Sequence, residues 1–197
     1  MPSAQADAIE VRPADSFADV ALVLAPRNPD SLVCWCLTYR LDAKGNRALD
    51  ARGRARAVED LTRQDPPPGV LAHVDGEVAG WAGVAPRADL HTYATSARFP
   101  HVDDLPVWIA HCFRVRGGFG GRGVAHALLR GAVDFAREHG APAIEGYPVD
   151  NHGAKVDRTL AYVGTRALFE AAGFAKVADT TAVSAGMPRV VMRLDLR

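Results

Sequence analysis

The stretch Val107–Gly140, VWIAHCFRVRGGFGGRGVAHALLRGAVDFAREHG, contains the most informative pattern in the chain. Its apolar start predicts a strand over 107–116, and its amphipathic end predicts a helix over 121–139 closed by glycine. Between them lies the turn Gly117–Gly123, in which five of seven residues are glycine. A turn with so many glycines has a high entropy cost on folding. This cost is understandable if a ligand must approach the backbone closely, where side chains would be in the way. Because the first N–H groups of a helix lack intrahelical partners, we expect a phosphate-bearing ligand here.

The composition is that of an ordinary globular domain. The chain has 197 residues, 48% of them hydrophobic, with 23 basic and 23 acidic residues. This balance gives no reason to expect nucleic acid as a partner, and no apolar run is long enough to span a membrane. Because the N-terminus has no secretory signal and the three cysteines form no disulfide framework, we expect a cytoplasmic protein. We further expect a flexible tail over 1–7 and a single domain over 8–197.

The remaining elements are predicted from periodicity, caps and turn residues. In the first third of the chain we expect a strand over 8–12, a helix capped at 15–16 and ending at 24, a strand or buried extended segment over 32–41, and a helix over 46–64. Hairpin strands are expected over 70–74 and 78–85. A connection over 87–106, with a short helix near 90–95, then leads to the strand before the glycine turn. After it we expect a strand over 143–149, a loop over 150–157, a helix over 162–172 and closing strands over 174–179 and 190–196 around a turn at 185–188. This order favours an α/β fold with a mixed sheet.

Three kinds of phosphate site compete for the glycine turn. A kinase-type phosphate loop needs Lys and then Ser or Thr after its last glycine, and Val124 and Ala125 exclude it. The segment Gly118–Gly123 matches the dinucleotide pattern G-x-G-x-x-G, and Glu145 lies near the distance expected for a ribose ligand. This interpretation is disfavoured, because Glu145 is expected in the middle of a strand and too little chain follows for a doubly wound sheet.

The third kind of site depends on two motifs in the second half of the chain. Val115–Leu129 resembles the acetyl-CoA signature of the GNAT N-acetyltransferase superfamily, in which a strand ending in valine precedes a glycine run that opens a helix. Leu168–Phe174, LFEAAGF, resembles the late Leu-Tyr-x-x-x-Gly-Phe motif of the same family. The sequence departs from the family at Gly120, where Gln or Arg is usual, and at Phe169, which replaces the tyrosine.

The resemblance implies a fold, a cosubstrate and a reaction. The fold is a twisted, mostly antiparallel mixed sheet with helices on both faces and a splayed strand pair near Val115. The cosubstrate is acetyl-CoA, no metal is needed, and the acetyl group passes directly to a primary amine of a small molecule or peptide. Family members are often dimers, so a homodimer is also expected. The implied cofactor residues are Phe113, Arg114 and Val115 along the pantetheine arm, and Gly121, Arg122, Gly123, Val124, Ala125 and His126 around the pyrophosphate.

The catalytic groups are less evident, because Phe169 lacks the hydroxyl of the family's tyrosine. A base must remove a proton from the amine, and an acid helps the thiolate to leave. His111 is the candidate base, because it is expected to share a strand face with Phe113. Tyr162, expected two turns before Phe169 on one helix, or Tyr147 is the candidate acid, although both also suit a structural tyrosine. The alternatives are a catalytically weak acyl-CoA-binding module and, less favoured, a dinucleotide-binding domain.

The three cysteines do not predict a metal site. Cys34 and Cys36 are one residue apart, so on a strand they point to opposite faces, and no second pair completes a zinc site. Together with Cys112 they are expected to be small buried hydrophobic residues.

Overall fold

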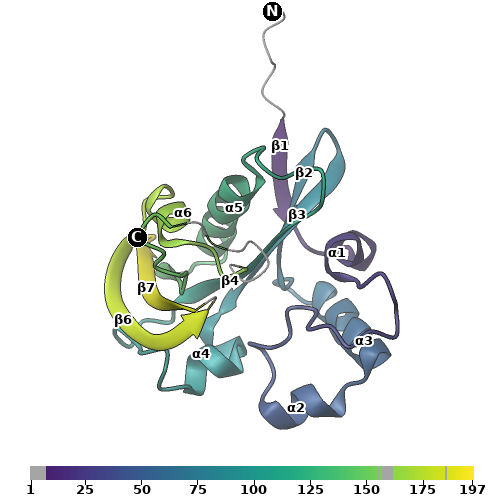
Figure 1. Ribbon diagram of the computed structural model, residues 1–197, viewed down its shortest axis with the longest axis horizontal. Coiled ribbons are helices and arrows are strands. Elements are labelled where there is room, and N and C mark those ends of the chain that lie inside the picture. The colour runs from purple at the N-terminus through teal and green to yellow at the C-terminus, as the bar shows by residue number, and fades with distance from the viewer. Residues whose placement is uncertain (1–7, 155, 157–161, 185) are drawn as a thin grey trace, which may run out of the picture.

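In the part of the chain that the structure describes, seven strands form one sheet in the order β1-β2-β3-β4-β5-β7-β6 (Figure 1). The computed structural model describes residues 8–154, 156, 162–184 and 186–197. Within this part of the chain, neighbouring strands are antiparallel except β4 and β5, so the predicted mostly antiparallel mixed sheet is confirmed. The strands are β1 (Ile9–Pro13), β2 (Gly69–Val74), β3 (Glu77–Pro86), β4 (Trp108–Val115), β5 (Ala143–Gly146), β6 (Ala175–Ser184) and β7 (Met187–Asp195).

Helices lie against both faces of the sheet, as predicted. Figure 1 shows α5 and α6 on one face and α1, α3 and α4 on the other. Leu128 is buried on the α5 face, whereas Val20 of α1 and Val58 of α3 share a buried cluster with Trp81 on the opposite face. No helix in the described part of the chain has the length and apolar character needed to cross a membrane. The helices are α1 (Phe17–Leu24), α2 (Ala43–Ala48), α3 (Ala51–Thr62), the 3₁₀-helix η1 (Arg87–Asp89), α4 (His91–Thr95), α5 (Val124–Glu138) and α6 (Arg166–Glu170).

Two local predictions are confirmed in detail. Ser16 caps α1, and its hydroxyl accepts a hydrogen bond from the N–H of Asp19 at 3.3 Å. The hairpin of β2 and β3 turns at Asp75 and Gly76, whose φ angles of 52° and 83° are those of a tight two-residue turn.

The helix predicted over 46–64 is in fact two helices. The carboxylate of Asp42 accepts from the N–H of Gly45, and that of Asp50 accepts from the N–H of Gly53, both at 2.6 Å. Each aspartate therefore caps one helix, α2 or α3. The prediction was wrong because it took Asp50 for an interior helix residue.

The segment 32–41, predicted as a strand or buried extended segment, is a series of turns. The N–H of Leu37 donates to the carbonyl of Cys34 at 2.9 Å. Trp35 and Cys36 have φ angles of 49° and 58°, in the left-handed region that bulky residues rarely adopt. The strand prediction is wrong because these apolar side chains reach the core from a turn rather than from a pleated strand.

Two helices in the second half begin later than predicted. α5 begins after Gly123, because Gly121 and Gly123 have φ angles of 79° and 82°, which are incompatible with a helix. α6 begins after Thr165, whose hydroxyl accepts from the N–H of Leu168 at 3.3 Å. Tyr162 therefore lies in the loop before α6, and the expectation that it shares a helix with Phe169 is wrong.

The last strands also differ in length from the prediction. β5 ends at Gly146, earlier than predicted, whereas β6 and β7 are longer than 174–179 and 190–196. Because β5 is so short, no strand among the described residues lies beside the second half of β4 on that side. The tail expected over 1–7 and Ala185 of the last turn lie outside the described residues.

Candidate functional site

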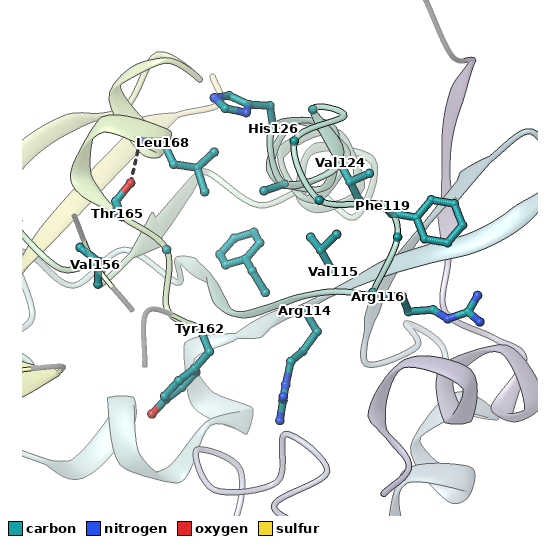
Figure 2. A pocket seen from close by; sticks show the side chains of 18 of the residues that line it. Arg114, Val115, Arg116, Phe119, Val124, His126, Val156, Tyr162, Thr165 and Leu168 are labelled. Atoms are coloured by element: carbon teal, nitrogen blue, oxygen red, sulfur yellow. Dashed lines mark hydrogen bonds between the residues drawn. The ribbon is translucent and has the colours of Figure 1, made fainter. Parts of the chain in front are cut away.

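A cleft of about 840 Å³ opens where β4 and β5 diverge (Figure 2). The two strands pair only over Trp108–Ala110 of β4, which confirms a splayed strand pair. The second half of β4 lines one side of the cleft, and the glycine turn with the start of α5 lines another. Tyr162, Thr165 and Leu168, from the loop before α6 and its first turn, lie across from them.

The backbone of β4 directs hydrogen-bonding groups into this cleft. The N–H of Phe113 donates to the carbonyl of Tyr162 at 2.7 Å, whereas the N–H of Arg116 donates in the other direction, to Ala79 of β3, at 2.9 Å. Because the direction of backbone groups alternates along a strand, those of Val115 point the same way as those of Phe113. A ligand arm beside Val115 can therefore pair with β4 as an added strand does.

The start of α5 has the properties of an anion site. Its N-cap is Gly123, which has a φ angle of 82° and no side chain to bond the first amides of the helix. The N–H groups of Val124, Ala125 and His126 therefore have no partner within the helix, and the helix dipole favours negative charge beside them. A Cβ atom added to Gly121 would meet nothing within 4 Å, so the backbone of the turn is open to a ligand.

All residues implied for the cofactor line the cleft except Arg122. The guanidinium of Arg122 lies over the ring of Phe119, 5.3 Å from its centroid, and its Nη2 is 3.4 Å from Oδ2 of Asp75. Arg116 also lies over Phe119, at 5.8 Å, and donates to the carbonyl of Val78. The two arginines therefore place positive charge at the outer side of the glycine turn.

His111, the candidate base, does not lie where the sequence predicted. The pairing of β3 with β4 skips His111, which is the extra residue of a β-bulge opposite Gly83 and Val84. The bulge shifts the alternation of side chains, so the expectation that His111 and Phe113 share a strand face is wrong. His111 is 1% exposed, and its ring packs edge-on against Tyr39 with 5.8 Å between ring centroids, whereas Phe113 lines the cleft.

The environment of His111 favours the neutral ring. Burial, and then the charges of Arg40 and Arg189, hold the pKa of His111 well below its usual value. Neither ring nitrogen has a hydrogen-bond partner among the described residues. His111 is therefore neutral at neutral pH, but the same burial and charges oppose its taking up a proton, and its role as a base stays a prediction.

This pKa shift leads to a testable dependence of stability on pH. Below about pH 6.5, His111 becomes protonated in the unfolded chain but not in the folded protein. The free energy of unfolding is therefore expected to decrease as the pH is lowered. The contribution of His111 is up to about 1.4 kcal/mol per pH unit. Urea unfolding between pH 5 and 7.5 is expected to show a flatter dependence for His111→Leu than for the wild type. The exposed-residue control His91→Gln should keep the wild-type slope, and an unchanged slope in His111→Leu would contradict the prediction.

Tyr162, one of the two candidate acids, lines the cleft. Its hydroxyl is 3.1 Å from the hydroxyl of Tyr39, which in turn accepts from Nη1 of Arg189 at 3.1 Å. Burial raises the pKa of Tyr162, so the hydroxyl keeps its proton at neutral pH. A hydrogen-bonded chain therefore leads from the cleft to a buried cation.

Arg189 is a functional candidate that sequence reasoning missed. Its guanidinium donates to the hydroxyls of Tyr39 and Tyr93 and to the carbonyl of Tyr147, and it lies over Phe99, 4.8 Å from the ring centroid. These described partners are all neutral and Arg189 is 4% exposed, so its charge favours negative charge on nearby groups. The sequence signal that could have identified Arg189 is its place directly before the apolar run Val190–Met192 of a strand, where a charged side chain is expected to be partly buried.

Tyr147, the other candidate acid, does not line the cleft. Its hydroxyl donates to the carboxylate of Glu145 at 3.1 Å, and Glu145 also accepts from Arg87 and Arg193. Glu145 is 0% exposed, so it cannot reach a ribose. Because the sheet is also not doubly wound, the dinucleotide alternative has no structural support.

Phe169, which stands at the tyrosine position of the family motif, is a core residue. It is 0% exposed and packs edge-on against Phe113 and Phe174, with 6.0 and 5.0 Å between ring centroids. It does not line the cleft, whereas Tyr162 does. The described cleft therefore has a tyrosine hydroxyl, but from a different segment of the chain than the motif predicts.

The cysteines gather on the side of β4 opposite α5. Cys36 and Cys112 are buried, with 2.7 Å between their sulfur atoms, as expected for small core residues. Cys34 is exposed, which contradicts the expectation, because it lies in the turn that carries Trp35 and Cys36. Among the described residues, no three His, Cys, Asp or Glu side chains are arranged to hold a metal ion.

Comparisons with known proteins agree with this geometry. Residues 35–174 match the model of the acetyltransferase (GNAT) family. A putative GNAT acetyltransferase from Desulfovibrio desulfuricans is 22% identical, covers 96% of this chain and 100% of its own, and has a TM-score of 0.55. YncA, a putative acetyltransferase from Salmonella typhimurium solved with its cofactor acetyl-CoA, is 16% identical with 98% and 95% coverage and a TM-score of 0.56. The ribosomal-protein-alanine N-acetyltransferase from Brucella melitensis is 20% identical with 95% and 99% coverage and a TM-score of 0.56.

At these identities the structural likeness supports the fold and no particular substrate. No curated protein matches the chain. The family model, by contrast, spans well over half of the residues, from the turn at Trp35 to the end of the late motif at Phe174. The chain therefore belongs to the GNAT acetyltransferase family, for which acetyl-CoA is the typical cosubstrate.

Proposed function

We propose that the protein transfers the acetyl group of acetyl-CoA directly to a primary amine. The observation that supports this most strongly is the meeting of two features in one cleft: the cleft-facing backbone of β4 at Val115 and the amides at the start of α5. The first suits the amide-containing pantetheine arm, and the second suits the pyrophosphate. The cofactor residues proposed are those predicted from the sequence: Phe113, Arg114 and Val115 contribute only the backbone of β4, and Arg122 contributes charge from outside the cleft.

In the proposed reaction, the amine nitrogen attacks the carbonyl carbon of the thioester. A carbon–nitrogen bond forms, the carbon–sulfur bond breaks, the amine loses a proton and the CoA sulfur gains one. A backbone N–H of β4 that faces the cleft can stabilise negative charge on the carbonyl oxygen. His111 is the proposed base, and because it is 1% exposed and does not line the cleft, this role requires a water molecule between the amine and its ring.

Tyr162 is the proposed donor of the proton to the CoA sulfur. After it has lost its proton, the phenolate oxygen can accept a hydrogen bond from Tyr39, 3.1 Å away. Arg189 lies behind Tyr39 and supplies positive charge. Tyr39 and Arg189 are therefore positioning residues that lower the free energy of the phenolate, which burial otherwise raises.

Tyr162→Phe is expected to lower kcat about 100-fold and to leave the KM for acetyl-CoA nearly unchanged. The ring and the backbone bond to Phe113 remain, so the loss reports on the hydroxyl alone. Tyr39→Phe is expected to have a smaller effect, because it acts through Tyr162. The matched control is Tyr147→Phe, which removes a hydroxyl outside the cleft and should leave kcat near the wild-type value. Steady-state kinetics measures all three, and a wild-type kcat in Tyr162→Phe would rule out this role.

The proposed function itself is tested by thiol release from acetyl-CoA with a panel of primary amines. We expect thermal stabilisation by acetyl-CoA but not by NAD, and amine-dependent release of CoA. Binding of acetyl-CoA without turnover of any amine would instead indicate an acyl-CoA-binding module, the alternative suggested by Phe169. Absence of acetyl-CoA binding would contradict both.

A further inference from the structure

Arg114 projects to the side of β4 that faces away from α5. Arg114 pairs with Trp81 of β3, and it lies two residues after Cys112, so its side chain is on the same face of the sheet as theirs. Trp81 and Cys112 belong to the buried cluster on the α1 and α3 side of the sheet. Figure 2 shows its side chain pointing away from the start of α5, in the same general direction as that of Tyr162. Arg114 is exposed and lines the cleft. Its guanidinium therefore points away from the proposed pyrophosphate site, in the same general direction as Tyr162, the proposed proton donor.

The described wall of the cleft carries positive charge, and no described residue that lines it is a carboxylate. Among the described lining residues, Arg114 and Arg116 are cationic and none is Asp or Glu. Arg116 is engaged with the carbonyl of Val78 and the ring of Phe119. Arg114, by contrast, makes no hydrogen bond or ion pair with any described residue, so its donors can bind a ligand.

We infer that Arg114 binds a carboxylate of the acceptor, and that the acceptor is a small primary amine that also carries a carboxylate, such as an amino acid. This inference rests on the proposed function. The planar guanidinium matches a carboxylate through two parallel N–H···O bonds. An acceptor with several amines and no carboxylate would instead meet the unbalanced charge of Arg114 and be repelled.

The test uses amines in matched pairs that differ by one carboxylate, such as tyrosine with tyramine and lysine with cadaverine. The wild-type enzyme is expected to show a kcat/KM about 10- to 100-fold higher for the carboxylated member of a pair. Arg114→Gln should remove this preference by raising the KM of the carboxylated amine, with little change for the other amine. Arg114→Lys keeps the charge without the planar fork and should restore part of the preference.

The outcomes separate this inference from the proposed function. The control Arg130→Gln replaces an exposed arginine of α5 outside the cleft and should keep the wild-type preference. Equal kcat/KM within each pair, or a preference that survives Arg114→Gln, would overturn the inference and leave the acetyltransferase function intact. If acetyl-CoA binds and no amine of either kind is acetylated, the proposed function fails and this inference fails with it.

Discussion

Replacing Ala125 with glutamate is expected to raise the KM for acetyl-CoA about 100-fold without destabilising the fold. Ala125 lies in the first turn of α5 and lines the cleft. A carboxylate at this position interacts favourably with the positive end of the helix dipole, so the ligand-free protein should be as stable as the wild type or more stable. The same carboxylate repels the pyrophosphate of the cofactor. Stability and cofactor binding should therefore change in opposite directions.

Ala125→Gln is the matched control, because glutamine has a similar shape and no charge. Calorimetric titration with acetyl-CoA and thermal unfolding of the ligand-free proteins measure the two effects. We expect the glutamine variant to bind acetyl-CoA much more tightly than the glutamate variant does. Equal weakening in both variants would indicate a steric effect, and wild-type binding in the glutamate variant would show that the pyrophosphate does not lie at α5.

Glu145→Ala is expected to lower the free energy of unfolding by about 3 to 5 kcal/mol. The carboxylate is 0% exposed and accepts hydrogen bonds from Arg87, Arg193 and Tyr147. Without this carboxylate, the guanidinium groups of Arg87 and Arg193 lose their buried anion. The hydrogen bonds that connect β5 to η1 and β7 through Glu145 are lost as well. For a chain of this length the expected loss in Tm is about 10 °C or more.

Asp103→Asn provides the matched control, because Asp103 pairs with the same Arg193, at 2.5 Å, but its side chain is 39% exposed. Solvent screens this pair, so its removal should lower Tm much less. Hydrogen bonds from Arg193 lower the pKa of Asp103 to about 2, so this contact persists above the unfolded pKa and is lost as the pH falls toward 2. Equal losses of Tm in the two variants would contradict the importance assigned to the buried carboxylate.

The sequence was sufficient for features that depend on neighbouring residues. Gly117–Gly123 and the amphipathic stretch after it predicted a glycine turn followed by a helix, which is confirmed, whereas the anion site at this helix start stays a prediction. The hairpin at Asp75 and Gly76 and the cap at Ser16 were also predicted from neighbouring residues. The family motif at Val115–Leu129 likewise describes a local backbone shape.

Side-chain positions around the cleft were predicted less accurately than these local features. The face that His111 occupies depends on a bulge set by the pairing with Gly83 and Val84, which no local pattern announces. Asp50 was not recognised as a cap, so one helix was predicted in place of two. Tyr162 was expected on a helix and lies in the preceding loop, because α6 begins only after Thr165.

The stretch Val107–Gly140 was thus enough to identify a strand, a glycine turn and a helix that together suit a phosphate-bearing cofactor. These features follow from conformational preferences of adjacent residues, which a sequence displays directly. The chain of contacts from Tyr162 through Tyr39 to Arg189 required the folded molecule. Its two hydrogen bonds join residues 123 and 150 positions apart, and such contacts exist only after the sheet has brought β7 beside the segment before α2.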